Sequence, residues 1–418
     1  MEGRGFTLRR APAGFWGLAP GAMRLRLLPG EIHQLTQLNE CAARRERLIT
    51  ALEHREPDRV PILFGGPECS IHQKAHENLL TYLNYETMLP APIIDTILQI
   101  VEPDVRLHPR LDVDAQFLVP SEAPVIWDAA GETYVDEFGR RFQRSVGFYN
   151  QVDHPLQQGT RQELALYKFP DLSQHDGAGG LADKAQRLHA QGFGLVADGA
   201  WGIYEISSSL RGAAELFMDM AANPSYVEAL AERVLEEHLK PFYELLLKEV
   251  GAWVQLVIIS DDCGSQEGLL FSPNMFRRIY LPRLLRLVEH IKKLVDAKVY
   301  IHSDGAVSAI IPDFIEAGID GLNPVQYTAK GMTAERLKRE FGKDLGFFGG
   351  GIDNEFLSFG SSEQVEWDVQ RQVSELAPGG GYLFATIHNI PPEVPPQNVV
   401  ACFRAAAEFG KCPVVQRL

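Results

Sequence analysis

Histidine and aspartate residues follow two apolar segments in the C-terminal half of the chain, and their types and spacing suit metal binding. His302 and Asp304 come at the end of segment Lys298–His302, and His388 follows segment Tyr382–Ile387. Imidazole and carboxylate groups are common ligands of zinc and other divalent metals. Three protein ligands leave a coordination position open for a substrate, as catalytic zinc requires. These three side chains are therefore a candidate catalytic metal site.

A metal-free interpretation of the same residues stays open. Asp304 can cap a helix that begins at Gly305. His388 can be a structural histidine, or it can act with Asp304 as a hydrogen-bonding or acid–base group. The residue types alone do not decide between the two interpretations.

Further polar residues and glycines follow neighbouring apolar segments. In a barrel, the carboxyl ends of the strands meet on one rim, so these loops predict one shared site. Glycines just past a strand also let the backbone approach a ligand closely. Asp353 is equally suited to capping a helix. The candidate substrate-binding residues in these loops are Asp262, Asn323, Gln326, Gly350 and Asp353.

Short apolar segments alternate with amphipathic helices along most of the chain. Eight such segments, nearly continuous in apolar residues, predict an α/β fold in which parallel strands close into a (β/α)8 (TIM) barrel. An open, doubly wound sheet is the alternative, but no G-x-G-x-x-G motif follows a strand. The expected strands are Val60–Phe64, Asp104–Leu107, Phe193–Ala197, Trp253–Ser260, Lys298–His302, Gly318–Leu322, Leu345–Phe348 and Tyr382–Ile387.

The rest of the chain is expected to divide into three parts. Residues 1–40 are Arg-rich and acid-poor, and we interpret them as a disordered extension or a misassigned start, with a transit peptide as the alternative. Residues 41–412 are expected to form the barrel. Within it, Pro124–Gln151 alternates apolar and polar residues between turns, which predicts a β-hairpin insertion after the second strand, as a lid or a dimer contact.

Composition and charge disfavour several classes of partner and location. The formal net charge of −15 disfavours nucleic acid and anionic membranes. No apolar run approaches the roughly 18 residues of a transmembrane helix. The five cysteines are widely spaced and form no C-x-x-C pair, which favours reduced thiols in the cytoplasm.

Several long segments resemble the uroporphyrinogen decarboxylase superfamily. RERLITALEHREPDRVPILFGG is similar to the opening of its members. The later segments DDCGSQEGLLFSP, KVYIHSDG, EAGIDGLNPVQ, GKDLGFFGGGID and LAPGGGYLFATIHNIPPEVPPQNVVA are similar to its later motifs, in the same order. The resemblance runs from about Arg45 to Gly410, and it implies a TIM barrel and an enzyme.

The resemblance covers two branches with different chemistry. True decarboxylases carry an arginine-rich signature after the first strand and an aspartate after the second; this chain has Phe64-Gly65-Gly66-Pro67-Glu68 and Leu107-His108-Pro109-Arg110 there. A polycarboxylate substrate needs such arginines. The corrinoid methyltransferases bind zinc through His-x-Cys and a later Cys, where this chain has His302, Asp304 and His388. This harder donor set favours an alkoxide, ether oxygen or amine over a thiol.

The resemblance and the residues together predict metal-assisted methyl transfer between a methylated small molecule and a corrinoid on a separate protein. Glu205 is expected to be a fourth ligand or proton donor, with a surface position as the alternative. Tyr204 and Trp201 are expected to line the pocket or belong to the core. Uroporphyrinogen decarboxylation and non-catalytic binding of a corrinoid or tetrapyrrole are the alternative functions. A homodimer is expected by family analogy.

Overall fold

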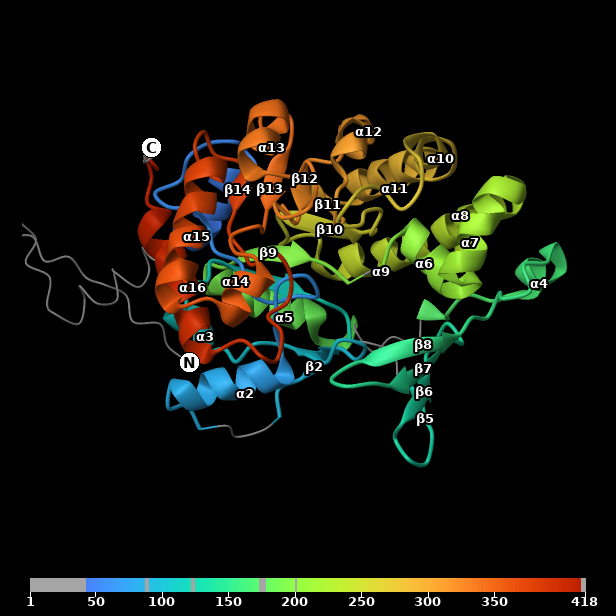
Figure 1. The fold of residues 1–418 in the computed structure, drawn as a ribbon, viewed down its shortest axis with the longest axis horizontal. Helices are drawn as coiled ribbons and strands as arrows, with labels where there is room; N and C mark the ends of the chain where they lie inside the picture. Colours follow the sequence, from blue (N-terminus) through green and yellow to red (C-terminus); the bar gives the residue numbers. More distant parts are fainter. Residues whose placement is uncertain (1–42, 87–89, 122–124, 173–177, 200, 415–418) are drawn as a thin grey trace, which may run out of the picture. The chain divides into compact units, whose positions relative to one another are not determined.

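The centre of the fold is a parallel sheet of seven strands in the order β14-β13-β12-β11-β10-β9-β4 (Figure 1). Its residues are buried except for the half-buried Lys298, as expected of parallel strands covered on both faces. The computed structural model describes residues 43–86, 90–121, 125–172, 178–199 and 201–414. The strands are β4 (Ala115–Leu118), β9 (Gly194–Ala197), β10 (Leu256–Ser260), β11 (Lys298–His302), β12 (Gly321–Asn323), β13 (Gly346–Phe348) and β14 (Tyr382–Leu383).

The predicted segments from Phe193 onwards each overlap one strand of this sheet, although β12 extends one residue beyond the predicted Gly318–Leu322. The prediction of a strand at Asp104–Leu107 is wrong. The Asp104 carboxylate accepts a hydrogen bond from the backbone of Arg106, which turns the chain into the short helix α3 (Leu107–Arg110). The strand in this region is β4. Its polar Gln116, and Asp114 just before it, interrupt the apolar pattern that we expected of a parallel strand.

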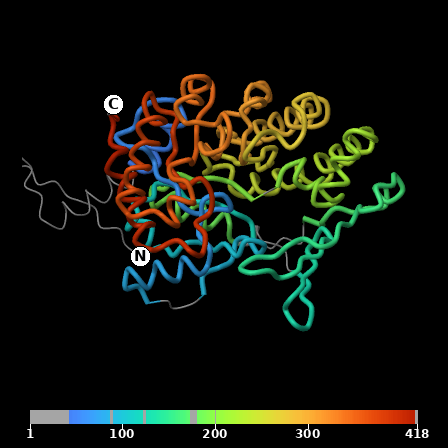
Figure 2. The backbone as a smooth tube through the Cα atoms, in the orientation of Figure 1, coloured from blue at the N-terminus to red at the C-terminus, as the bar shows by residue number. Residues whose placement is uncertain are grey.

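The predicted first strand, Val60–Phe64, pairs at single residues. Ile62 forms a parallel bridge to Phe384, just beyond β14, and Leu63 forms a parallel bridge to Ala115 in β4. The segment therefore touches both edge strands of the seven-stranded sheet. Figure 2 shows the first and last described segments side by side, where Val60 N donates to Gly410 O at 2.8 Å.

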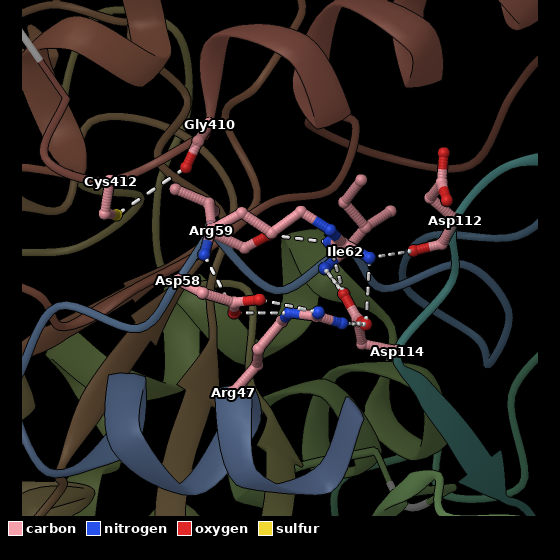
Figure 3. Close-up of polar contacts among 9 residues, drawn as sticks. Arg47, Asp58, Arg59, Ile62, Asp112, Asp114, Gly410 and Cys412 are labelled. Atoms are coloured by element: carbon pink, nitrogen blue, oxygen red, sulfur yellow. Dashed lines mark hydrogen bonds and ion pairs between the residues drawn. The ribbon is translucent and has the colours of Figure 1, made fainter. Parts of the chain in front are cut away.

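Asp114 anchors this first segment just before β4 begins (Figure 3). Its fully buried carboxylate accepts hydrogen bonds from the Arg59 guanidinium at 2.6 and 3.0 Å and from Arg47 Nη1 at 2.9 Å. It also accepts from the backbone N–H of Ile62 at 2.9 Å, and Asp58 pairs with the other side of Arg47. The buried charge is thus paired on every side, as burial requires.

Helices follow the strands and begin at recognisable caps. Ser272 and Ser361 accept hydrogen bonds from the first turns of their helices, whereas the Asn223 side chain makes no capping bond. Residues 43–52 are helical, and the other helices are α2 (Gln73–Tyr82), α4 (Arg161–Leu166), α5 (Ala178–Ala190), α6 (Ile203–Arg211), α7 (Ala213–Ala222), α8 (Pro224–Val234), the π-helix η2 (Leu235–Leu239), α9 (Lys240–Val250), α10 (Pro273–Ile279), α11 (Leu281–Leu294), the 3-10 helix η3 (Ser308–Ile310), α12 (Ile311–Glu316), α13 (Ala334–Phe341), α14 (Asn354–Phe359), α15 (Ser362–Leu376) and α16 (Pro396–Phe409).

Two smaller antiparallel sheets accompany the large one. The segment expected to form a hairpin forms four strands in sequential order, β5 (Ile126–Trp127), β6 (Thr133–Val135), β7 (Arg141–Arg144) and β8 (Tyr149–Asp153). Tyr134, Phe142 and Tyr149 pack together as its own small core. The other sheet has the order β1-β3-β2 and consists of β1 (Ile71–His72), β2 (Ile93–Asp95) and β3 (Ile100–Val101).

Three further predictions concern the N-terminal extension, the state of the cysteines and transmembrane helices. The predicted extension, residues 1–40, lies outside the described residues, as does Cys41. The other four cysteines are free thiols. No helix in the described part of the chain combines the length and apolar character needed to cross a membrane.

The Asp114 network generates a stability prediction. Asp114→Asn keeps the shape of the side chain but removes the buried negative charge that pairs with the guanidiniums of Arg59 and Arg47, of which Arg47 keeps only Asp58 among the described residues. We expect the free energy of unfolding to fall by about 3 kcal/mol, measured by urea denaturation. Asp112→Asn, an exposed position two residues away, is the matched control and should change it by less than about 0.5 kcal/mol. Equal effects of the two substitutions would show that the network does not stabilise the fold.

Candidate active site

His302 lies at the carboxyl end of β11, and strand pairing places its neighbours. In the parallel register, Ser260 at the end of β10 pairs with His302, and His302 pairs with Asn323 at the end of β12. His302 Nδ1 is hydrogen-bonded to Asn323 Oδ1 at 2.6 Å. The Asn323 amide in turn donates to Phe348 O at 3.1 Å. Asn323, predicted to bind substrate, thus orients the imidazole of His302.

Carboxylates surround the buried His302 ring. Glu68 Oε2 lies 3.2 Å from Nδ1, and Asp262 Oδ1 lies 3.6 Å from Nε2. Burial alone would lower the pKa of His302, but the surrounding carboxylates, led by Glu68 and Asp262, raise it to about 10. Without a metal, the imidazole is therefore held as a cation at neutral pH.

The three residues predicted to bind metal lie near one another but do not form a single donor set. His388 Nε2 lies 4.0 Å from Asp304 Oδ2, and the rings of His302 and His388 are 5.8 Å apart between centroids. They are divided between two possible donor sets that share His302: one adds Glu68 and His388, the other adds Asp262 and Asp304. Within each set, one ligand atom per residue lies within 4.8 Å of the others. Each set offers imidazole and carboxylate donors of the kind that divalent metals bind.

The loop after β11 is held in place by neighbouring loops. Asp304 N donates to Asp262 Oδ1 at 2.7 Å, and Gly305 N donates to Gln326 Oε1 at 2.6 Å. Gly305 has a φ of +86°, and a Cβ there would lie 2.6 Å from the carbonyl carbon of Gly264. Burial raises the pKa of Asp304, and its Oδ1 atom is buried without a hydrogen-bond partner. That oxygen is free to bind a ligand.

Glu205 reaches the site from the first turn of α6. The Asp261 carboxylate accepts from the backbone N–H groups of Tyr204 and Glu205, at 3.1 and 2.9 Å, and so fixes the start of the helix. A Cβ at Gly202 would lie 2.1 Å from Ser260 O, so only glycine permits this approach. Ser260 Oγ donates to Glu205 Oε2 at 3.0 Å, and burial, with the nearby charge of Asp262, raises the pKa of Glu205 to about 8.

Three further residues predicted to bind substrate do not line the cavity: Tyr204, Gly350 and Asp353. Tyr204 is buried, with its ring against Phe271 and Tyr280, so the structure places it in the core. Gly350 packs against the loop after β12, where a Cβ would lie 2.5 Å from Val325 O. Asp353 caps α14 by accepting from Glu355 N at 2.9 Å.

A cavity of about 350 Å³ opens over these strand ends. Its lining includes His302, His388 and Trp201, together with residues from the small sheet β5–β8 such as Tyr134 and Phe138. Among the described lining residues, Arg140 is the single Lys or Arg, and it pairs with Asp136 at 2.6 Å. The acidic lining residues are Glu68, Asp95, Asp136, Glu137, Asp198, Glu205 and Asp262.

Two site residues, Glu68 and Asp198, were missed by the sequence analysis. Glu68 belongs to the segment that we noted only for lacking arginines, and nothing in its pattern marks it as a partner of His302. Asp198 directly follows β9, so the rule that singled out the other strand ends should have included it. Burial raises the pKa of Asp198 to about 7.

Comparisons with known proteins agree with this architecture. The uroporphyrinogen decarboxylase (URO-D) family profile matches residues 199–409. The structure is similar to that of a methyltransferase from Methanosarcina mazei, with a TM-score of 0.63 and 18% sequence identity, over 88% of this chain and 98% of that chain. At this identity the likeness concerns the fold. An endo-1,4-β-mannanase from Rhizomucor miehei is more weakly similar, with a TM-score of 0.40 and 11% identity over 84% and 96% of the two chains. Comparison with curated proteins gives no match.

The charges around His302 predict an unusual titration in the metal-free protein. Asp262→Asn removes one of the carboxylates that raise the pKa of His302, so that pKa should fall by about one to three units. Side-chain NMR of ¹⁵N-histidine-labelled protein measures it. Asp353→Asn, at a helix cap outside the cavity, should leave it unchanged. A wild-type His302 that loses its proton below about pH 7 would contradict the expected charge.

Proposed function

Because the chain belongs to the uroporphyrinogen decarboxylase family, we propose that it is an enzyme of metal-assisted methyl transfer. The methyl group would move between a methylated small molecule and a corrinoid carried on a separate protein. The observation that carries this proposal is the proximity of His302 to Glu68, His388, Asp262 and Asp304, all of which except Asp304 line the cavity.

The donor groups suit a divalent metal such as zinc. They offer imidazole nitrogens and carboxylate oxygens, and the buried, unbonded Oδ1 of Asp304 has a ligand position to fill. His302 would be the common ligand, joined by His388 and Glu68 or by Asp304 and Asp262. When bound, the metal would act as a Lewis acid toward the heteroatom that carries the methyl group.

Glu205 is suited to moving the proton of this reaction. When the methyl group passes to a reduced cobalt(I) corrinoid, the new carbon–cobalt bond uses the cobalt electron pair, and the heteroatom keeps the pair of the broken bond. That heteroatom then takes a proton. Glu205 has a pKa raised to about 8, so its carboxyl group still carries a proton at neutral pH. Ser260 orients the carboxyl group by its hydrogen bond.

The acidic lining of the cavity argues against porphyrinogen decarboxylation, the activity for which the family is named. A polycarboxylate needs cationic partners. The described lining offers a single arginine, Arg140, which already pairs with Asp136, among seven acidic residues. Carboxyl groups with raised pKa values lie beside histidines in this site, and such groups are more typical of catalytic sites than of purely binding sites.

Closure of the barrel and the protein's partners are part of the same proposal. The bridges of Ile62 to Phe384 and of Leu63 to Ala115 support an eighth strand that closes the sheet into a TIM barrel, with residues 126–153 as an insertion over the cavity. We propose that the partner in trans is a corrinoid protein and that the chain forms a homodimer. We also propose a cytoplasmic location, which the free thiols support.

Metal content tests the donor set directly. We expect purified wild-type protein to hold about one divalent metal per chain, because three donors converge on one point, and His302→Ala to lose most of it. Elemental analysis by mass spectrometry measures the stoichiometry. His290→Ala, which removes a histidine on α11 outside the cavity, is the control. A variant without His302 that keeps its metal would place the ion elsewhere.

Methyl transfer tests the reaction. With a donor panel of methylated amines, ethers and alcohols, we expect methylation of cob(I)alamin, followed by its absorption spectrum. Glu205→Gln should slow the reaction by about 100-fold, because the proton donor is lost, while metal content stays unchanged. Release of carbon dioxide from uroporphyrinogen, with no methyl transfer from any donor, would overturn the proposal in favour of decarboxylation.

A further inference from the structure

The described lining of the cavity holds more acidic residues than basic ones. Of its seven acidic residues, Asp136 is neutralised by Arg140, and Glu68 and Asp262 lie in the donor sets around His302. Asp198 belongs to neither group. Its charge is opposed by that of His302, but no ion pair within the described part of the chain includes Asp198, so a positively charged ligand would stabilise its buried carboxylate.

Asp198 places an unpartnered carboxylate oxygen in the cavity wall. The residue directly follows β9 and is 1% exposed. Its Oδ1 accepts from Gly199 N at 2.7 Å, but its Oδ2 is buried with no hydrogen-bond partner. Buried carboxylate oxygens are almost always hydrogen-bonded, so an orphaned one that lines a cavity indicates a missing ligand group.

An aromatic ring lies near Asp198, next to the residue that follows it in the chain. Phe242 also lines the cavity, and its Cζ lies 3.9 Å from where a Cβ of Gly199 would be, which places the ring near Asp198. The same cavity already holds one cation on aromatic faces: the Arg140 guanidinium lies 4.6 Å from the ring centroids of both Phe138 and Trp201. Aromatic faces and a carboxylate together bind quaternary and protonated ammonium groups.

We propose that the substrate is a small organic cation, whose ammonium group lies between Asp198 and Phe242 while its reacting end faces His302 and His388. This inference rests on the proposed function for the identity of the reacting end. The cavity of about 350 Å³ is of the size that small-molecule sites have. Substrate charge would then offset the buried carboxylate of Asp198.

Binding of a cation and of its neutral isostere tests the proposal. Isothermal titration calorimetry on the full, zinc-loaded chain would compare choline with dimethylbutanol, in which carbon replaces the nitrogen. We expect choline to bind at least about tenfold more tightly, because a desolvated ammonium gains from both a carboxylate and a ring face. Asp198→Asn should remove that preference and leave the affinity for dimethylbutanol unchanged.

Two further variants keep the test decisive. Asp296→Asn makes the same change of charge at an exposed position before β11, and should preserve the preference. Phe242→Leu keeps an apolar side chain but removes the π face, and it should weaken choline binding more than dimethylbutanol binding. This variant also tests the proposal if Asp198→Asn does not fold.

The outcomes separate this inference from the proposed function. Equal affinities for the two compounds, or no binding of choline at millimolar concentration, would overturn the inference even if methyl transfer is observed. Selective choline binding that depends on Asp198, without metal or methyl transfer, would leave the inference standing and overturn the proposed reaction instead.

Discussion

The register between three neighbouring parallel strands is the constraint on which the site depends. It sets Ser260, His302 and Asn323 side by side at the ends of β10, β11 and β12. Asn323 then orients the His302 ring on one flank, and Ser260 orients Glu205 on the other. Because side chains alternate along a strand, a slip of one residue would turn His302 away from both partners.

The chemistry of the site follows from placing many carboxyl groups where water is scarce. Burial makes each charge costly, so the pKa values of Glu68, Asp198 and Glu205 all rise. Glu68, together with Asp262 and Asp304, makes the charged form of His302 favourable. A metal ion or a cationic ligand relieves this repulsion, and the site is therefore organised to receive positive charge.

Glycines in the loops allow the helices and strands around the site to approach one another closely. Gly202 lets the start of α6 approach the end of β10, and Gly305 lets two strand-end loops touch backbone to backbone. The small sheet β5–β8 is tied to the cavity wall through Arg140, which precedes β7 and donates to Ser209 Oγ on α6 at 3.0 Å. The site is thus assembled from segments that are far apart in the chain.

The amino-acid sequence by itself determined the alternation of strands and helices, the strand that ends at His302, and the convergence of polar residues at strand ends, since these depend on local periodicity and on a general rule for parallel strands. It misplaced the strand before the insertion, because Gln116 and the neighbouring Asp114 are polar yet buried, and only the partners of Asp114, Arg47 and Arg59, make that burial tolerable. Only the tertiary structure decided that Glu68 faces His302, that Tyr204 belongs to the core and that one oxygen of Asp198 lacks a partner. Those properties are set by contacts between residues distant in sequence, and no local pattern records them.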